Sequence, residues 1–77
     1  MSVDHSSINK LLEVMIILQE DKVLKIAREL ISHLTPEDIR NPQDFPELER
    51  DALFNYEDGM LSGFLAVRSS YLALLKK

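Results

Sequence analysis

Histidine and acidic side chains are the residues of this sequence best suited to chemistry, because together they can hold a metal ion. His33 follows Glu29 by four residues, a spacing that places both on one face of a helix. Di-iron helical bundles instead use Glu-x-x-His, three residues apart and in two copies. The chain has neither copy, and His5 lies near its start. We expect no metal site and no bound cofactor, with His33 solvated near a helix end.

Serine, glycine and adjacent acids give no sign of nucleophilic or phosphate chemistry. No serine lies in a nucleophile motif, and capping or packing explains Ser6, Ser7, Ser62, Ser69 and Ser70. Gly59 and Gly63 lack the lysine that follows the glycines of a phosphate-binding loop. Glu57 and Asp58 are adjacent, so on a helix they point in different directions and do not form a magnesium pair. The sequence therefore predicts a protein without enzymatic activity.

The charge of the chain is negative and unevenly distributed. The formal net charge is -4 and the pI is about 5.0. A nucleic-acid binder displaces counterions with a basic face, so we expect no nucleic-acid partner. Residues 35–58 hold eight acids against two arginines, whereas residues 59–77 hold three basic residues and no acid. Lys22, Lys25 and Arg28 share a helix face that Glu29 interrupts, which is typical of a solvated surface.

The chain is short for a self-sufficient domain. A domain of 77 residues buries only about 60% of the surface that its unfolded chain exposes. There is no cysteine, which excludes disulfides and thiolate metal sites. A partner subunit is the leading remaining source of stability. The lack of cysteine, together with a start that has no basic region before an apolar run, predicts a cytoplasmic protein.

The element pattern predicts one all-α domain over residues 1–77, a small helical bundle of two or three main helices of the helical-hairpin type. Residues 1–7 are polar and are expected to be frayed, with Ser6 or Ser7 as the first cap. Apolar residues follow helical spacing over residues 8–34. No glycine or proline interrupts them, which favours one helix, whereas a hairpin at residues 20–22 gives a tighter core. Both alternatives stay open, with a slight preference for the break.

Residues 35–54 are expected to form a proline-punctuated crossover made of single helical turns. Residues 35–38 read Thr-Pro-Glu-Asp, which is a capping residue, a proline at the first helical position and an acid at the third. Asn41 and Pro42 begin the same pattern again. The apolar members of the crossover are expected to pack against the main helices; they are Ile39, Phe45, Leu48, Leu53 and Phe54.

The last helix is expected over residues 55–76, capped by Asn55, with a start near Glu49 as the alternative. Residues 59–75 contain a single charge, Arg68, although a surface helix of a small monomer should have a charged face. Small residues take the polar positions: Gly59, Ser62, Gly63, Ala66, Ser69, Ser70 and Ala73. A glycine inside a helix costs about 1 kcal/mol relative to alanine, which implies a compensating contact.

Three arrangements explain this nearly uncharged helix. We favour burial on two sides, one in its own subunit and one in the partner of a homodimer. The alternatives are a monomer whose crossover covers the second face, and a membrane span. A span is disfavoured because 17 residues are at the lower limit of length and Arg68 lies near the middle, so we expect none. The predicted dimer interface consists of Gly59, Gly63, Ala66, Ser70, Val14 and Ile17.

The acidic crossover, taken as residues 41–58, is the candidate docking surface for another protein, because its acids ring large apolar side chains that resemble interface anchors. The candidate residues are Asp44, Phe45, Glu47, Glu49, Asp51 and Tyr56. Alternatively, the apolar side chains among them only close the core. The sequence predicts a non-enzymatic protein-interaction module: a small dimeric adaptor, regulator or accessory subunit. The alternative is a small-molecule-binding or metal-binding helical protein, or a subunit of an enzyme.

Overall fold

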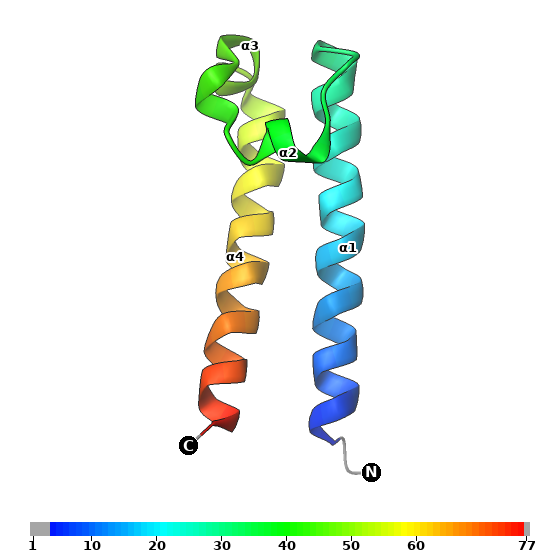
Figure 1. The fold of residues 1–77 in the computed structure, drawn as a ribbon, viewed down its shortest axis with the longest axis vertical. Helices are drawn as coiled ribbons and strands as arrows, with labels where there is room; N and C mark the ends of the chain where they lie inside the picture. The colour runs from blue at the N-terminus through cyan, green and yellow to red at the C-terminus, as the bar shows by residue number, and fades with distance from the viewer. Residues whose placement is uncertain (1–3, 77) are drawn as a thin grey trace.

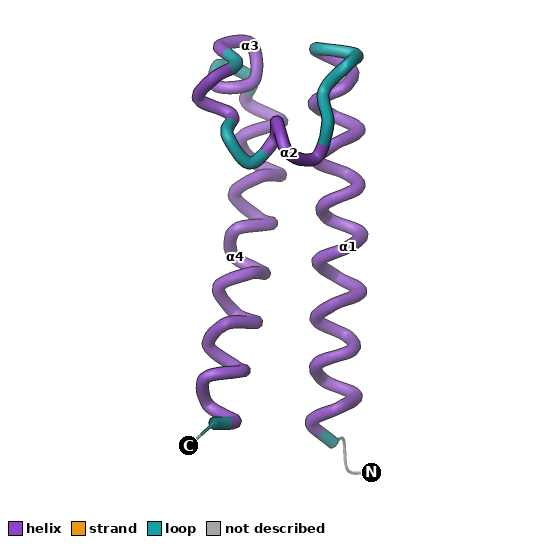
Figure 2. The backbone as a smooth tube through the Cα atoms, in the orientation of Figure 1, coloured by secondary structure: helices purple, strands orange, loops and turns teal. Residues whose placement is uncertain are grey.

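Two long helices joined by three short ones make up the fold (Figure 1). The computed structural model describes residues 4–76. The long helices are α1 (His5–Leu30) and α4 (Ala52–Leu75). The short ones are α2 (Pro36–Ile39), the 3-10 helix η1 (Pro42–Asp44) and α3 (Pro46–Glu49). Figure 2 shows helices and loops but no strand in this part of the chain, which confirms the predicted all-α class.

The helices α1 and α4 pack side by side and run in opposite directions, so α1 begins where α4 ends (Figure 1). We call this the open end, and we call the end that bears α2, η1 and α3 the closed end. The molecule measures 45 × 22 × 20 Å and has a radius of gyration of 14.8 Å. A globular domain of this length has a radius of gyration of about 11.5 Å. The chain is therefore an elongated helical hairpin.

The first helix is continuous, so the break that was favoured at residues 20–22 is absent. No glycine or proline interrupts the stretch. Gln19 donates a hydrogen bond to the carboxylate of Glu57 at 2.9 Å, and Lys22 pairs with the same carboxylate at 2.9 Å. These two bonds hold the middle of α1 against α4, so the pairing with α4 replaces the expected internal hairpin.

The start of α1 lies two to three residues before the expected one. The carboxylate of Asp4 accepts a hydrogen bond from the backbone N–H of Ser7 at 2.7 Å and so caps the helix. Ser6 and Ser7 lie inside the first turn, and the prediction that one of them is the cap is wrong. Aspartate and serine are about equally good caps, but the charged carboxylate of Asp4 also suits the positive end of the helix dipole. Residues 1–3 of the expected frayed segment lie outside the described residues.

The crossover reverses the chain through three short turns that each begin with proline. Thr35 and Asp38 form the capping box of α2: the backbone N–H of each donates to the side-chain oxygen of the other, at 3.0 and 3.3 Å. This confirms the predicted cap at Thr35. The repeated pattern at Asn41 and Pro42 places a proline at the start of η1, but the side chain of Asn41 makes no capping hydrogen bond.

The last helix begins at Ala52, between the two starts that were expected. The carboxylate of Asp51 accepts a hydrogen bond from the backbone N–H of Phe54 at 2.7 Å and caps the helix. Asn55 lies inside the first turn, where its amide donates to the backbone carbonyl of Glu49 at 2.8 Å. The predicted cap at Asn55 is wrong because Asp51 supplies a cap one turn earlier.

The buried core lies at the closed end of the hairpin. Its six members are Val23, Ala27, Leu34, Ile39, Leu48 and Phe54. The crossover is pinned to the long helices as expected through Ile39, Leu48 and Phe54, and Phe45 is half-buried against the same cluster. Leu53 is 53% exposed, so its expected packing is wrong. Leu53 and Phe54 point about 100° apart around the axis of α4, and Phe54 is the one that points into the core.

Candidate protein-interaction surfaces

The two histidines lie far apart in the structure, in α1 and in the turn that follows it. His33 lies in the turn after α1 ends, so Glu29 and His33 do not share a helix face as the spacing suggested. His5 forms a hydrogen bond through Nδ1 with the hydroxyl of Tyr71 at 2.7 Å, which joins the start of α1 to the end of α4. Within residues 4–76 no three His, Asp or Glu side chains come close enough to hold a metal ion.

Two rows of apolar side chains run along the long helices and are largely uncovered by the chain itself: six of their eight members are exposed, and Ile8 and Met60 are half-buried. We call them the α1 row and the α4 row, and together they form the open face. The α1 row is Ile8, Leu11, Met15 and Leu18, and the α4 row is Leu53, Met60, Val67 and Leu74. Leu18 and Leu74 are each 64% exposed, and Val67 is 55% exposed. Such a large exposed apolar surface is typical of an interaction site.

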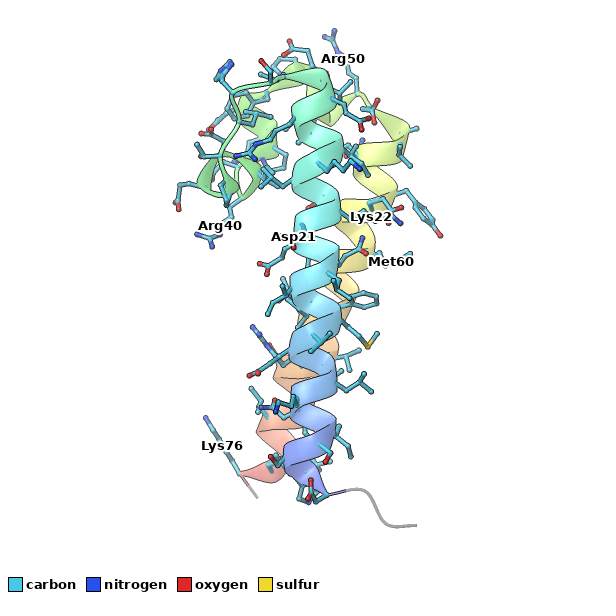
Figure 3. The ribbon with its side chains drawn as sticks, turned by 90° about the vertical axis from the view of Figure 1, so that its right-hand side faces the viewer. Asp21, Lys22, Arg40, Arg50, Met60 and Lys76 are labelled. Atoms are coloured by element: carbon cyan, nitrogen blue, oxygen red, sulfur yellow. The ribbon has the colours of Figure 1, made fainter. Side chains whose placement is uncertain are left out.

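Both rows lie on the same side of the helix pair. Lys22 continues the α1 row by one turn, and Figure 3 shows that it projects to the same side as Met60 of the α4 row. Asp21 and Arg40 project to the other side, where the crossover lies (Figure 3). The crossover therefore covers one face of the hairpin near the closed end and leaves the open face bare.

The open half of the molecule has almost no core of its own. Beyond Glu57 no residue of α4 is buried, and before Gln19 the only buried residue of α1 is Ile16. The chain exposes 5713 Å² of surface. A globular monomer of 8.9 kDa exposes about 4,800 Å². The excess of roughly 900 Å² is close to the area of about 800 Å² that one partner contributes to a standard protein interface.

The six residues of the predicted dimer interface are all exposed in the chain, but they do not share one face. Gly63 and Ser70 flank the α4 row, each three residues after a member of it, and Val14 lies at the edge of the α1 row. Gly59 and Ala66 lie farther round α4. Adding a Cβ at either glycine would meet no atom within 4 Å. The close contact expected at the glycines is therefore not made within one chain.

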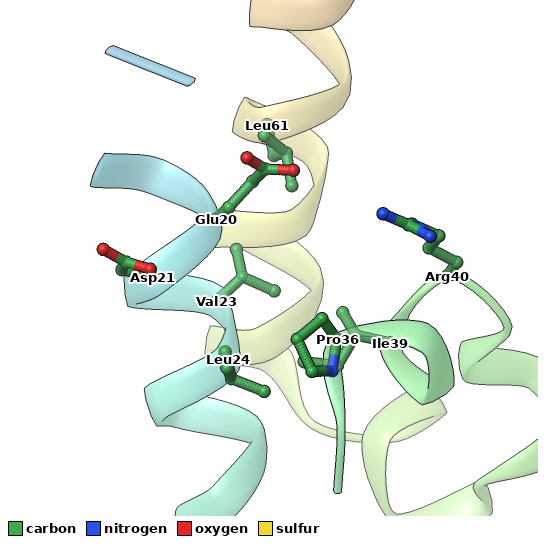
Figure 4. Close-up of a pocket in the computed structure, with 8 residues that line it drawn as sticks. All are labelled: Glu20, Asp21, Val23, Leu24, Pro36, Ile39, Arg40 and Leu61. Atoms are coloured by element: carbon green, nitrogen blue, oxygen red, sulfur yellow. The ribbon is translucent and has the colours of Figure 1, made fainter. Parts of the chain in front are cut away.

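Ile17 faces the crossover side of the hairpin. It precedes Leu24 by two turns, and Leu24 lines a hollow of about 320 Å³ between α1, α2 and α4 (Figure 4). The other lining residues are Glu20, Asp21, Val23, Pro36, Ile39, Arg40 and Leu61. Arg40 lies across this hollow from Glu20 (Figure 4). Ile17 and the α1 row thus belong to two different surfaces.

A buried polar cluster sits where the open half meets the core. Gln19 and Glu57 are 7% and 5% exposed. The Gln19 amide donates both to the Glu57 carboxylate and to the Glu57 backbone carbonyl, at 2.9 and 2.8 Å. The hydrogen bond from Gln19 and the nearby Lys22 ammonium lower the pKa of Glu57 below its usual value of 4.5. Spacing alone did not reveal this cluster, because Gln19 reads as part of a polar turn.

The acidic crossover offers fewer docking residues than the sequence indicated. Asp44, Glu47 and Glu49 are exposed, as a docking surface requires. Asp51 is the cap of α4, so its carboxylate has a structural role. The remaining two candidates lie in different surroundings. Phe45 packs against the core, whereas Tyr56, on α4, is 66% exposed. Tyr56 lies three residues after Leu53 and so borders the open face.

Comparison of the chain with protein-family models, curated proteins and solved structures finds no match. Among the described residues, neither long helix combines the length and the apolar character needed to cross a membrane. The candidate interaction surfaces therefore rest on the geometry of this chain alone. The rows of the open face were visible in the sequence as apolar positions seven residues apart, but the pattern did not reveal which of them lack a partner.

Proposed function

We propose that the protein is a non-enzymatic interaction module that works as a homodimer, with the open face as the dimer interface. The observation that carries this proposal is the bare apolar surface of the open face. Its members are 37% to 64% exposed at Leu11, Met15, Leu18, Leu53, Val67 and Leu74. Complete burial of one such side chain contributes about 1.5–3 kcal/mol. Two copies that cover each other's open face would gain this burial free energy at each of these side chains.

The acidic crossover gives the dimer a second surface for a different protein. Asp44, Glu47 and Glu49 are exposed and belong to neither row of the open face, so dimerisation through that face would leave them accessible. Exposed charges of one sign attract an oppositely charged partner and raise its association rate. We therefore propose an adaptor, regulator or accessory subunit whose crossover binds a basic surface of another protein.

Light scattering tests the homodimer, with a pair of matched variants. Leu11 and Ile17 are 59% and 56% exposed on α1, but only Leu11 belongs to the open face. We expect the unsubstituted protein to have twice the 8.9 kDa mass of one chain at micromolar concentration. Leu11→Glu should then give the monomer, because it buries a charge in the interface. Ile17→Glu should stay dimeric.

Two outcomes would contradict this assignment. A single-chain mass for the unsubstituted protein would remove the homodimer itself. A dimer that survives Leu11→Glu but dissociates with Ile17→Glu would move the interface to the crossover side of the hairpin.

A further inference from the structure

We propose that the second copy docks on the open face with its hairpin reversed, so that the two closed ends lie at opposite ends of a four-helix bundle. The inference rests on the homodimer proposed above and adds its orientation. A two-fold axis that brings two open faces together can run along the helices or across them. The first choice puts both closed ends together, and the second puts each closed end beside the partner's open end.

The α4 row can pair with the α4 row of a second copy that runs in the opposite direction. Its members are spaced seven residues apart, so a two-fold axis across the helix pairs Leu53 with the partner's Leu74 and Met60 with the partner's Val67. This axis passes beside Gly63. The same reversal sets the large side chain of Tyr56 opposite the small Ser70 of the other copy. Gly63 has no atom within 4 Å of an added Cβ, which leaves room for a second backbone at the crossing point.

The α1 row can also pair with the same row of a second copy that runs in the opposite direction. Reversal about residue 13 pairs Ile8 with the partner's Leu18 and Leu11 with the partner's Met15. Each helix would thus pack against its own copy in antiparallel fashion. This is an isologous contact, in which the same patch serves on both subunits.

The two independent reversal points lie at the same level of the hairpin. The hydrogen bond of His5 with Tyr71 and that of Gln19 with Glu57 fix how α1 stands against α4. Residue 13 lies about midway between the two bonded positions of α1, residues 5 and 19. Residue 63 lies about midway between the two bonded positions of α4, residues 57 and 71, so residues 13 and 63 are at the same height along the hairpin. A single two-fold axis therefore satisfies the α1 row and the α4 row at once, although nothing in the packing of one chain requires this coincidence.

The charge distribution favours the same orientation. Residues 20–58 at the closed end hold eleven acids against five basic residues, whereas the rest of the chain holds two acids against four. Reversal sets each acidic closed end beside the partner's basic open end. The other orientation sets two acidic ends side by side, and like charges in proximity oppose association.

Disulfide trapping tests the orientation, because the chain has no cysteine of its own. Gly63→Cys should form a covalent dimer under mild oxidation, since residue 63 meets its own copy at the axis. Leu53→Cys and Leu74→Cys should each stay uncrosslinked alone and should form a mixed disulfide when combined. This second pair keeps the test valid if a side chain at position 63 disturbs the packing.

The opposite orientation predicts a different crosslink. It sets α1 against the partner's α4 at the same level, so that Met15→Cys mixed with Met60→Cys would form the disulfide. That result, or a dimer by light scattering in which neither Gly63→Cys nor the Leu53 and Leu74 pair crosslinks, would overturn the reversed orientation and leave the homodimer standing. A monomer by light scattering would instead remove both proposals.

Discussion

At the scale of single residues, Gly63 gives the clearest test of whether the open face is covered. Helix propensity predicts that Gly63→Ala stabilises the chain by about 1 kcal/mol. A partner backbone at this point predicts the opposite sign, because overpacking costs about 1–3 kcal/mol. We expect destabilisation that diminishes as protein concentration rises, measured by thermal unfolding across a dilution series.

Gly59 supplies the matched control for this experiment. It lies in the same helix and is equally free of neighbours, but it lies farther round α4 from the α4 row. Gly59→Ala should therefore stabilise the protein. If Gly63→Ala melts higher than the unsubstituted protein, as Gly59→Ala should, the α4 row is open to solvent.

The Gln19–Glu57 cluster makes the stability depend on pH. The hydrogen bond from Gln19 and the Lys22 ammonium lower the pKa of Glu57 from 4.5 in the folded protein. The unfolded chain therefore takes up this proton first as the pH falls. The contribution of Glu57 is present above pH 4.5 and is lost as the pH falls through the lower, folded pKa. We expect melting temperatures to decrease upon acidification.

Glu57→Gln should reduce this dependence on pH. The variant keeps an oxygen that can accept from Gln19 but has no charge to titrate, so its melting temperature should fall less between neutral and acidic pH. Some dependence should remain, because backbone hydrogen bonds also lower the pKa of Asp4 and of Asp38. Glu20→Gln removes an exposed charge from α1 and serves as the control. Equal slopes for Glu57→Gln and the unsubstituted protein would contradict the coupling.

At the scale of elements, the caps determine where the helices begin. Thr35→Ala and Asp51→Ala should each cost about 1 kcal/mol of unfolding free energy, the usual loss for an N-cap. Asn55→Ala should cost less, because Asn55 lies inside the first turn and Asp51 still caps the helix. Denaturant midpoints measure all three. A larger loss for Asn55→Ala than for Asp51→Ala would show that α4 starts later in solution.

The sequence predicted the element types well and their boundaries less well. Helical spacing and the proline pattern identified the two long segments and the crossover between them. The continuity of α1 was left open. The lack of glycine and proline favoured one helix, but the bonds that hold residues 19–22 against α4 come from Glu57, far along the chain. The start of α4 was misplaced because Asp51 and Asn55 are both good caps, and the burial of Phe54 decides between them.

The predicted dimer interface and the open face lie beside each other but do not coincide, for a physical reason. The small residues of α4 drew attention to one side of that helix, whereas the structure leaves the α4 row beside it bare. Apolar spacing identifies residues that need to be buried but does not say whether the same chain buries them. Only the placement of the crossover on the opposite side reveals that the open face has no cover.

At the scale of the whole molecule, charge and shape separate the two proposed surfaces. Reversing the charges of Asp44, Glu47 and Glu49 to lysine should leave the dimer and its melting nearly unchanged, because exposed charges contribute little to folding. The same triple variant should retain less of any partner captured by the unsubstituted dimer from extracts of native cells. Undiminished capture of that partner would show that the crossover only closes the core.

The placement of the core at one end also has a consequence for how the chain acquires its structure. The closed end can form by itself, since its buried residues come from one chain, and this step should not depend on concentration. In the proposed dimer, the open half would gain its buried contacts only from a second chain, so it should become ordered in a bimolecular step. Backbone amides of α1 before Gln19 and of α4 after Glu57 should therefore exchange hydrogen faster on dilution, while amides around Phe54 keep their protection.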